Sequence, residues 1–239
     1  MSPLERKSLF GLASLYAFRM IGLFMLLPVL SLYADQYSGS TIILVGFALG
    51  IYGLTQGLFQ IPLGFLSDRF GRKPIIFIGM LIFFLGSIIA ATSETMWGLI
   101  AGRALQGAGA VASTIMALLS DLTTEQSRTK AMAVIGASIG VSFAISLIAG
   151  PILANLWGIS GLFWLTAILS IFALLILFFL VPTPSVLRQN AESQAVPQMF
   201  SRLLRNQELL RLNFGIAVLH FSQMAIWISV PLILEQTFN

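Results

Sequence analysis

The sequence predicts an all-α integral membrane protein, and three observations lead to that fold class. Hydrophobic residues make up 57% of the chain and charged residues only 9%, whereas soluble domains carry about 25% charged residues. The apolar residues gather in seven runs, each near the length of about 20 residues that a spanning helix needs. Once these runs are taken as spans, the basic residues fall on one side of the membrane.

The elements follow in order along the chain. A polar lead, residues 1–8, precedes a first run that is too long for the core of a signal peptide. The predicted spans are 9–33, 42–66, 74–92, 96–120, 131–154, 159–181 and 210–234. Segment 182–208 is polar and proline-containing, and its second half alternates apolar and basic residues, as in a short amphipathic helix on a membrane surface. We therefore expect a six-helix bundle over 1–181, a cytoplasmic linker over 182–208, and a seventh spanning helix within 209–239.

The basic residues set the expected orientation. Three alternate connections, 34–41, 93–95 and 155–158, contain no Lys or Arg. Eleven of the 13 basic residues lie in the lead, in the other connections or, for Arg211, at the very start of the seventh span: Arg6, Lys7, Arg69, Arg72, Lys73, Arg128, Lys130, Arg188, Arg202, Arg205 and Arg211. The positive-inside rule then predicts a cytoplasmic N-terminus.

The composition also excludes several functions. Without cysteine, the chain has no disulfide, no thiol nucleophile and no cysteine-based metal site, and its single histidine cannot form a metal cluster. No paired carboxylates or nucleophile constellation suggests an enzyme, and we expect no cofactor. We attribute the net charge of +4 to topology and lipid contact, not to nucleic-acid binding.

A dense charged motif connects the second and third spans. It reads Gly64-Phe65-Leu66-Ser67-Asp68-Arg69-Phe70-Gly71-Arg72-Lys73-Pro74. Asp68 and Arg72 are four residues apart, so a continuing helical turn makes them neighbours. Gly71 permits a sharp turn, and Pro74 is tolerated in the first turn of the next helix. Asp121, at the cytoplasmic end of the fourth span, is the expected partner of Arg72.

This motif resembles the loop 2–3 signature of the major facilitator superfamily, G-x-L-a-D-r-x-G-r-k. Seven positions match, and Ser67 replaces the small Ala: Gly64, Leu66, Asp68, Arg69, Gly71, Arg72 and Lys73. The resemblance implies a twelve-helix fold built from two six-helix halves, each a 3+3 repeat. We therefore expect this chain to be an N-terminal half, a linker and helix 7, cut short of the full fold, and the full-length protein to be a monomer.

The resemblance also implies a role for the charges at the hinge. In the family, such a network locks the outward-open state and breaks when the transporter turns inward, so Asp68, Arg72 and Asp121 are expected to form a conformational latch. The alternative is a static surface ion pair, which stabilises a protein by about 0–1 kcal/mol.

Two arginines lie inside spans. The segment around Arg103, residues 99–110, resembles the family's helix 4 motif l-x-x-x-R-x-x-q-G-x-g-a, in which this Arg is associated with proton coupling. A structural Arg bonded to Gln106 and backbone carbonyls is the alternative. Helices 1–3 and 4–6 overlay as a repeat that puts Arg19 at the corresponding depth. The segment from Gly22 to Pro28 resembles a helix 1 signature of 12-helix drug:proton antiporters, and the whole pattern resembles the YajR-type bacterial transporters.

Helices 2 and 5 carry further candidate residues. Helix 2 has a stripe of small residues suited to close helix packing: Gly46, Gly50, Gly53 and Gly57. Gln56 and Gln60, with Gln106, are expected either to face a central cavity or to hydrogen-bond between helices. In helix 5, Gly150-Pro151 resembles the antiporter Gly-Pro motif without its following glycines, and Pro151 is expected to kink or end the helix.

A proton acceptor is hard to identify from the sequence. No Asp or Glu lies within the seven predicted spans. His220 in the seventh span is a candidate proton relay, although a packing role with a hydrogen bond is the alternative. The other options are Asp35, in a wet cavity at the outer end, or a residue in the absent half.

Together these features predict a secondary active transporter in a bacterial cytoplasmic (inner) membrane. The expected activity is proton-coupled efflux, or antiport, of small amphipathic compounds by alternating access, as in multidrug resistance. Expected partners are lipid, a small-molecule substrate and protons. The alternative is a non-transporting structural or assembly protein of the membrane, or an inactive fragment.

Overall fold

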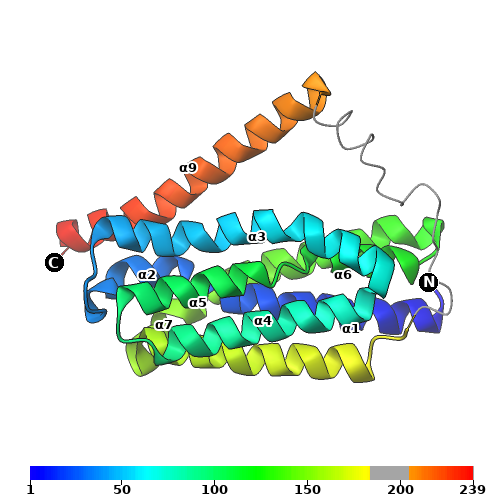
Figure 1. Ribbon diagram of the computed structural model, residues 1–239, viewed down its shortest axis with the longest axis horizontal. Coiled ribbons are helices and arrows are strands. Elements are labelled where there is room, and N and C mark those ends of the chain that lie inside the picture. The colour runs from blue at the N-terminus through cyan, green and yellow to red at the C-terminus, as the bar shows by residue number, and fades with distance from the viewer. Residues whose placement is uncertain (184–204, 239) are drawn as a thin grey trace. The chain divides into compact units, whose positions relative to one another are not determined.

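The computed structural model describes residues 1–183 and 205–238, and the chain divides into two units, Met1–Leu187 and Arg188–Asn239. The helices of the first unit lie side by side in a bundle (Figure 1). They are α1 Pro3–Phe24, α2 Leu27–Tyr33, the 3-10 turn η1 Ala34–Gln36, α3 Ile42–Phe70, α4 Arg72–Thr92, α5 Met96–Ala108, α6 Ala112–Asp121 and α7 Glu125–Phe179. The second unit contains α9 Gln207–Phe238, which covers the predicted seventh span. The expected amphipathic helix of the linker falls largely on residues outside the described ranges.

Within the described residues, four helical stretches are long and apolar enough to cross a membrane. They are Pro3–Gln36, Ile42–Phe70, Arg72–Thr92 and Glu125–Phe179. The last contains both the fifth and sixth predicted spans, which meet at Gly158, where a φ of 68° interrupts the helix. A positive φ is favourable only for glycine, so this residue marks the turn between the two spans. The predicted fourth span is divided into α5 and α6.

Two spans are broken at equivalent places in the repeat. In the first span, α1 gives way to α2 at Met25, six residues after Arg19, and Pro28 lies in the first turn of α2, where proline is tolerated. In the fourth span, α5 gives way to α6 at Gly109, six residues after Arg103. The equal spacing agrees with the 3+3 repeat expected from the sequence.

Glycines bring α4 and α5 into backbone contact. A Cβ on Gly86 would lie 2.6 Å from the amide nitrogen of Gln106, and a Cβ on Gly102 would lie 2.7 Å from that of Ala90. No side chain larger than hydrogen fits there without a shift of the backbone. The two helices therefore hold the region around Gly109 in a fixed position.

The glycine stripe of α3 differs from the sequence prediction. A Cβ on Gly46, Gly50, Gly53 or Gly57 would meet no described atom within 4 Å. Among the described residues, this stripe is thus an open face and not a packed helix contact.

The prediction for Pro151 is wrong in one respect. Helix α7 continues through Pro151 and is interrupted only at Gly158 among its residues. A proline costs a helix one backbone hydrogen bond, and burial of the surrounding helix outweighs that loss: Gly150 and Ala154 on either side of it are buried.

The two outer connections of the bundle also touch. The amide of Ser38 donates to the carbonyl of Glu94 at 3.0 Å, and the amide of Met96 donates to the carbonyl of Ser38 at 3.1 Å. This short bridge ties the connection after η1 to the one before α5.

Candidate functional site

At the charged hinge, a single residue separates two helices. Gly71 ends α3 and begins α4, with φ 97° and ψ 151°. An L-residue with a side chain is strained in that conformation, which explains the glycine. The turn brings Asp68, in the last turn of α3, against Arg72, the first residue of α4.

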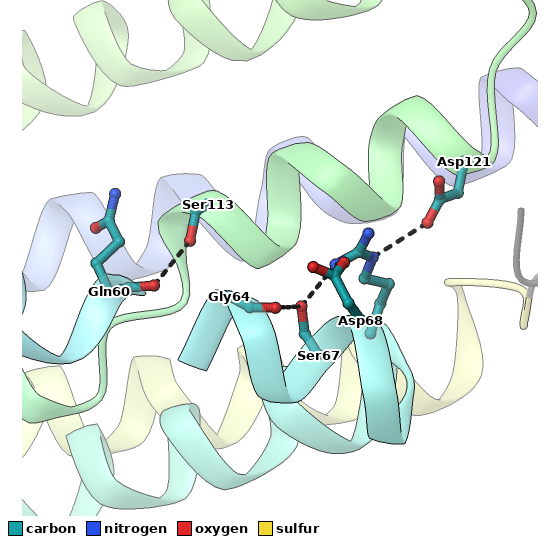
Figure 2. Close-up of polar contacts among 7 residues, drawn as sticks. Gln60, Gly64, Ser67, Asp68, Ser113 and Asp121 are labelled. Carbon is teal, nitrogen blue, oxygen red and sulfur yellow. Dashed lines mark hydrogen bonds and ion pairs between the residues drawn. The ribbon is translucent and has the colours of Figure 1, made fainter. Parts of the chain in front are cut away.

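Arg72 is the centre of the hinge contacts, and its partners Ser67, Asp68 and Asp121 are labelled in Figure 2. Its guanidinium forms an ion pair with Asp68, and its Nε donates to Oδ2 of Asp121 at 3.2 Å. Its Nη1 donates to Oγ of Ser67 at 2.7 Å, and that hydroxyl donates to the carbonyl of Gly64 at 2.6 Å. Arg72 is 12% exposed, Asp121 17% and Asp68 36%. The pairs are therefore partly shielded from water, which strengthens them relative to exposed pairs.

The other basic residues of the hinge make separate contacts. The guanidinium of Arg69 lies 5.5 Å from the centre of the Phe70 ring and takes no part in the Arg72 network. Lys73 Nζ donates to the carbonyl of Val181 at 2.7 Å, just beyond the end of α7. A lysine at a helix C-terminus satisfies free carbonyls there. The sequence did not indicate this link between the hinge and the start of the linker.

Arg103 is buried inside the bundle with its hydrogen bonds largely satisfied. It is 1% exposed, and its Nη1 donates to Oε1 of Gln106 at 3.0 Å while its Nε donates to the carbonyl of Ala48 at 3.4 Å. Its guanidinium lies 4.6 Å from the centre of the Tyr52 ring. Gln106 in turn donates to Ser87 at 2.8 Å. This geometry matches the structural alternative considered for Arg103. Gln106, which is 0% exposed, lies between helices and not at an open cavity.

Arg19 is equally buried, at 1% exposure, but less well satisfied. Both of its hydrogen bonds come from Nη2, to the hydroxyl of Tyr52 at 3.2 Å and to the carbonyl of Gly109 at 3.4 Å. Its guanidinium lies 5.5 Å from the centre of the Phe83 ring. Placing an arginine at the centre of a membrane costs about 2.5–3.5 kcal/mol or more. Arg19 and Arg103 thus meet at Tyr52, within the bundle and not on an open cavity wall.

The remaining predicted residues do not join these two groups. Gln56 and Gln60 are half-buried on α3, and Gln60 contributes its backbone carbonyl to the hydroxyl of Ser113 at 3.5 Å (Figure 2). His220 is exposed on α9, where its Nδ1 lies 2.9 Å from the carbonyl of Ile216 in the same helix.

The Gly-Pro motif lies beside the break in the first span. A Cβ on Gly150 would lie 2.7 Å from the carbonyl of Met25. Only glycine allows α7 to approach the end of α1 this closely. Within the described ranges, no group of three His, Asp or Glu side chains is placed to hold a metal ion.

Glu5 is a further functional candidate that the sequence prediction missed. Its Oε1 accepts hydrogen bonds from the amide and hydroxyl of Thr124, at 2.8 and 2.9 Å. Its Oε2 accepts from the amide of Ser2 at 2.6 Å, which completes a capping box. One carboxylate therefore caps both α1 and α7. The Ser-x-x-Glu spacing at residues 2–5 predicts the first cap, but only the fold reveals the second.

Comparison with known proteins identifies the family. A model of the Major Facilitator Superfamily matches residues 12–239. The chain belongs to the major facilitator superfamily. It is 50% identical to the inner membrane transport protein YajR of Escherichia coli K12, over 97% of this chain and 51% of that protein. It is 32% identical to a class B tetracycline resistance protein of Escherichia coli, over 73% of this chain and 44% of that protein.

Solved structures agree on the fold. A bacterial homolog of the human lysosomal transporter Spinster, in an inward-facing conformation, superposes with a TM-score of 0.78 at 16% identity, covering 98% of this chain and 56% of that one. The chain spans about half the length of the YajR protein and of the tetracycline resistance protein.

The predicted family and the predicted fold class are thereby confirmed. The chain is the N-terminal six-helix part of a facilitator fold with a seventh helix, and the family consists of membrane transporters, not enzymes. Its apolar helices and its inner-membrane relative place it in a bacterial inner membrane as a multi-pass protein.

Proposed function

We propose that this chain is the N-terminal part of a proton-coupled exporter of small amphipathic compounds that works by alternating access. Relatives named for tetracycline and multidrug resistance support export. The distribution of basic residues supports a cytoplasmic N-terminus, which puts the Gly71 hinge on the cytoplasmic side.

The observation that carries the proposal is the position of Arg72 between two carboxylates from different helices. Asp68 belongs to α3 and Asp121 to α6, so Arg72 fastens the cytoplasmic ends of three helices. Asp68 is the most exposed of the three at 36%, which leaves it accessible to donors from a second half. We infer that the network is the conformational latch: it forms in one state of the transport cycle and breaks in the other.

The proton route in this proposal begins with Arg103. A fixed positive charge stabilises the charged form of any nearby acid and thereby favours proton release. No acid lies within the predicted spans, so the acceptor is either His220, Asp35 or a residue of the second half.

Flux measurements test the proposal. The intact gene product, purified from its own membrane and reconstituted in liposomes, should expel a fluorescent amphipathic substrate when a pH gradient is imposed. Asp68→Asn should abolish that flux, because a neutral amide loses the ion pair with Arg72. Glu125→Gln is the matched control, since Glu125 is an exposed carboxylate on the same side of the bundle.

Each outcome decides between alternatives. Loss of flux in Asp68→Asn with normal flux in Glu125→Gln supports the latch. Normal flux in both variants contradicts the latch but not transport. Absence of any gradient-driven flux in the wild-type protein, with a range of cationic, neutral and anionic dyes, favours a non-transporting membrane protein.

A further inference from the structure

The break in the fourth span leaves the N-terminus of a helix inside the bundle. Helix α5 ends at Ala108, Gly109 has φ −72° and ψ 40°, and α6 begins at Ala112. Val111, the residue before α6, gives no side-chain cap. The first amides of a helix have no partner within the helix and carry partial positive charge. Ala110 and Val111 are 0% exposed, so this helix start lies away from water.

Two unpartnered polar side chains flank the same break. Nε and Nη1 of Arg19 have no hydrogen-bond partner among the described residues, although the same guanidinium reaches the carbonyl of Gly109 through Nη2. Thr114, in the first turn of α6, is 0% exposed, and its hydroxyl likewise has no partner in the part of the chain that the structure describes. Buried polar groups are nearly always hydrogen-bonded, so such groups call for an explanation.

The charge at this place is unbalanced as well. Arg19 and Arg103 both contact Tyr52. Arg19 donates a hydrogen bond to the tyrosine hydroxyl, and the guanidinium of Arg103 lies over the tyrosine ring. None of the seven predicted spans contains an acidic residue that would neutralise them. Arg103 has acceptors for its side chain, whereas Arg19 retains free donors. The excess positive charge is therefore concentrated at Arg19.

We propose that the break between α5 and α6 is a binding site for a small anionic group. Its donors are Nε and Nη1 of Arg19, the hydroxyl of Thr114 and the first amides of α6. Discontinuous helices in transporters present half-helix N-termini to anionic groups in the same physical way. Because Arg19 is 1% exposed and Thr114 0%, the ligand must be small: a halide, or the carboxylate of an organic molecule.

The site is distinct from the latch and does not depend on the proposed function. Anion binding is an equilibrium property of the bundle, whether or not the protein exports a substrate. Water is the competing occupant, because water molecules also satisfy buried donors. A bound anion differs from water in that it adds stability, and this stability grows with the logarithm of the anion concentration above the dissociation constant.

Thermal unfolding of the intact, purified gene product tests this site. The midpoint is followed while chloride, or separately acetate, replaces gluconate at constant ionic strength; gluconate is too bulky for a buried site. We expect the midpoint to rise with the logarithm of the anion concentration once that concentration exceeds the dissociation constant. Arg19→Gln should remove this rise, and Thr114→Val should weaken the apparent affinity about tenfold, as loss of one hydrogen bond to a charged group predicts.

Ser113→Ala is the matched control for Thr114→Val. Ser113 is the adjacent residue in the same helical turn, but its hydroxyl already donates to the carbonyl of Gln60. We expect its anion affinity to equal that of the wild type. If Arg19→Gln does not fold, the two hydroxyl variants decide the question alone.

The chloride and acetate titrations distinguish the possible ligands. A rise in the midpoint with chloride supports a free inorganic anion, and a rise with acetate alone supports the carboxylate of an organic ligand. Absence of a rise with either anion, or equal loss of affinity in Thr114→Val and Ser113→Ala, overturns the proposal. Asp68→Asn, which is expected to block flux, should keep anion binding intact, so a failure of the latch and a failure of this site are distinguishable.

Discussion

The arginines of this bundle lie in two contrasting environments. Arg72 at the hinge has two carboxylates and a hydroxyl as partners and keeps some contact with water. Arg103 and Arg19 lie inside the bundle without an acidic partner among the described residues, held by an amide side chain, backbone carbonyls and aromatic rings. Partners of opposite charge that meet water exchange more easily than neutral acceptors in a buried interior. The contrast fits the proposed latch, in which the hinge changes partners and the interior keeps its contacts.

Removal of Arg103 is expected to have the largest effect on stability. Arg103→Leu leaves Gln106 and the carbonyl of Ala48 without their donor in a dry site. Each buried acceptor left without a donor costs about 1–3 kcal/mol, measured as a loss in the free energy of unfolding in mixed micelles. Arg103→Leu combined with Gln106→Leu should recover part of that loss, because no unpaired amide oxygen remains. Additive losses in the double variant would contradict this account of the network.

Removal of Asp121 is expected to affect transport more than stability. Asp121→Asn leaves Arg72 paired with Asp68, so the free energy of unfolding should change by less than about 1 kcal/mol. Flux should fall about tenfold, which corresponds to about 1.4 kcal/mol. Raising the salt concentration should reduce wild-type flux toward that of the variant, since ions screen partly exposed pairs. Flux in Arg103→Lys, which keeps the hinge pairs intact, should show the same salt dependence as the wild type.

The smallest effect is expected for Ser67. Ser67→Ala removes the acceptor that holds Nη1 of Arg72 but leaves both carboxylates in place. One such hydrogen bond contributes about 1 kcal/mol, so flux should fall about fivefold, with little change in the unfolding midpoint. Ser113→Ala serves again as the control. A loss as large as that of Asp121→Asn would mean that the hydroxyl, and not the charge, orients Arg72.

The sequence predicted the hinge well because its contacts are local or terminal. Asp68 and Arg72 are neighbours by helical spacing alone, and Gly71 has the one conformation that only glycine favours. Asp121 was also foreseen, since charges at the ends of spans have few alternatives to pairing with one another. At the ends of the spans few charged partners are available, so the sequence alone is enough to predict which charges pair.

The interior was predicted less well because its contacts join distant segments. The acceptor of Arg19 at Gly109 lies 90 residues away along the chain, and no periodic pattern identifies a carbonyl as a partner. The break in the fourth span was also missed, because Gly109 occurs within a motif that otherwise continues as a helix. Similarly, Pro151 was expected to kink or end the fifth span, but the helix continues to Gly158, where a positive φ that favours glycine ends the span.

The two breaks have a consequence for the way the bundle meets each side of the membrane. The first and fourth spans run in opposite directions, so an identical six-residue interval after Arg19 and Arg103 falls at opposite depths. In the proposed orientation, the short segment cut off in the first span, α2, faces outward, and its counterpart α6 faces the cytoplasm. The first and fourth spans therefore each contribute one short helix, α2 and α6, to opposite surfaces of the membrane.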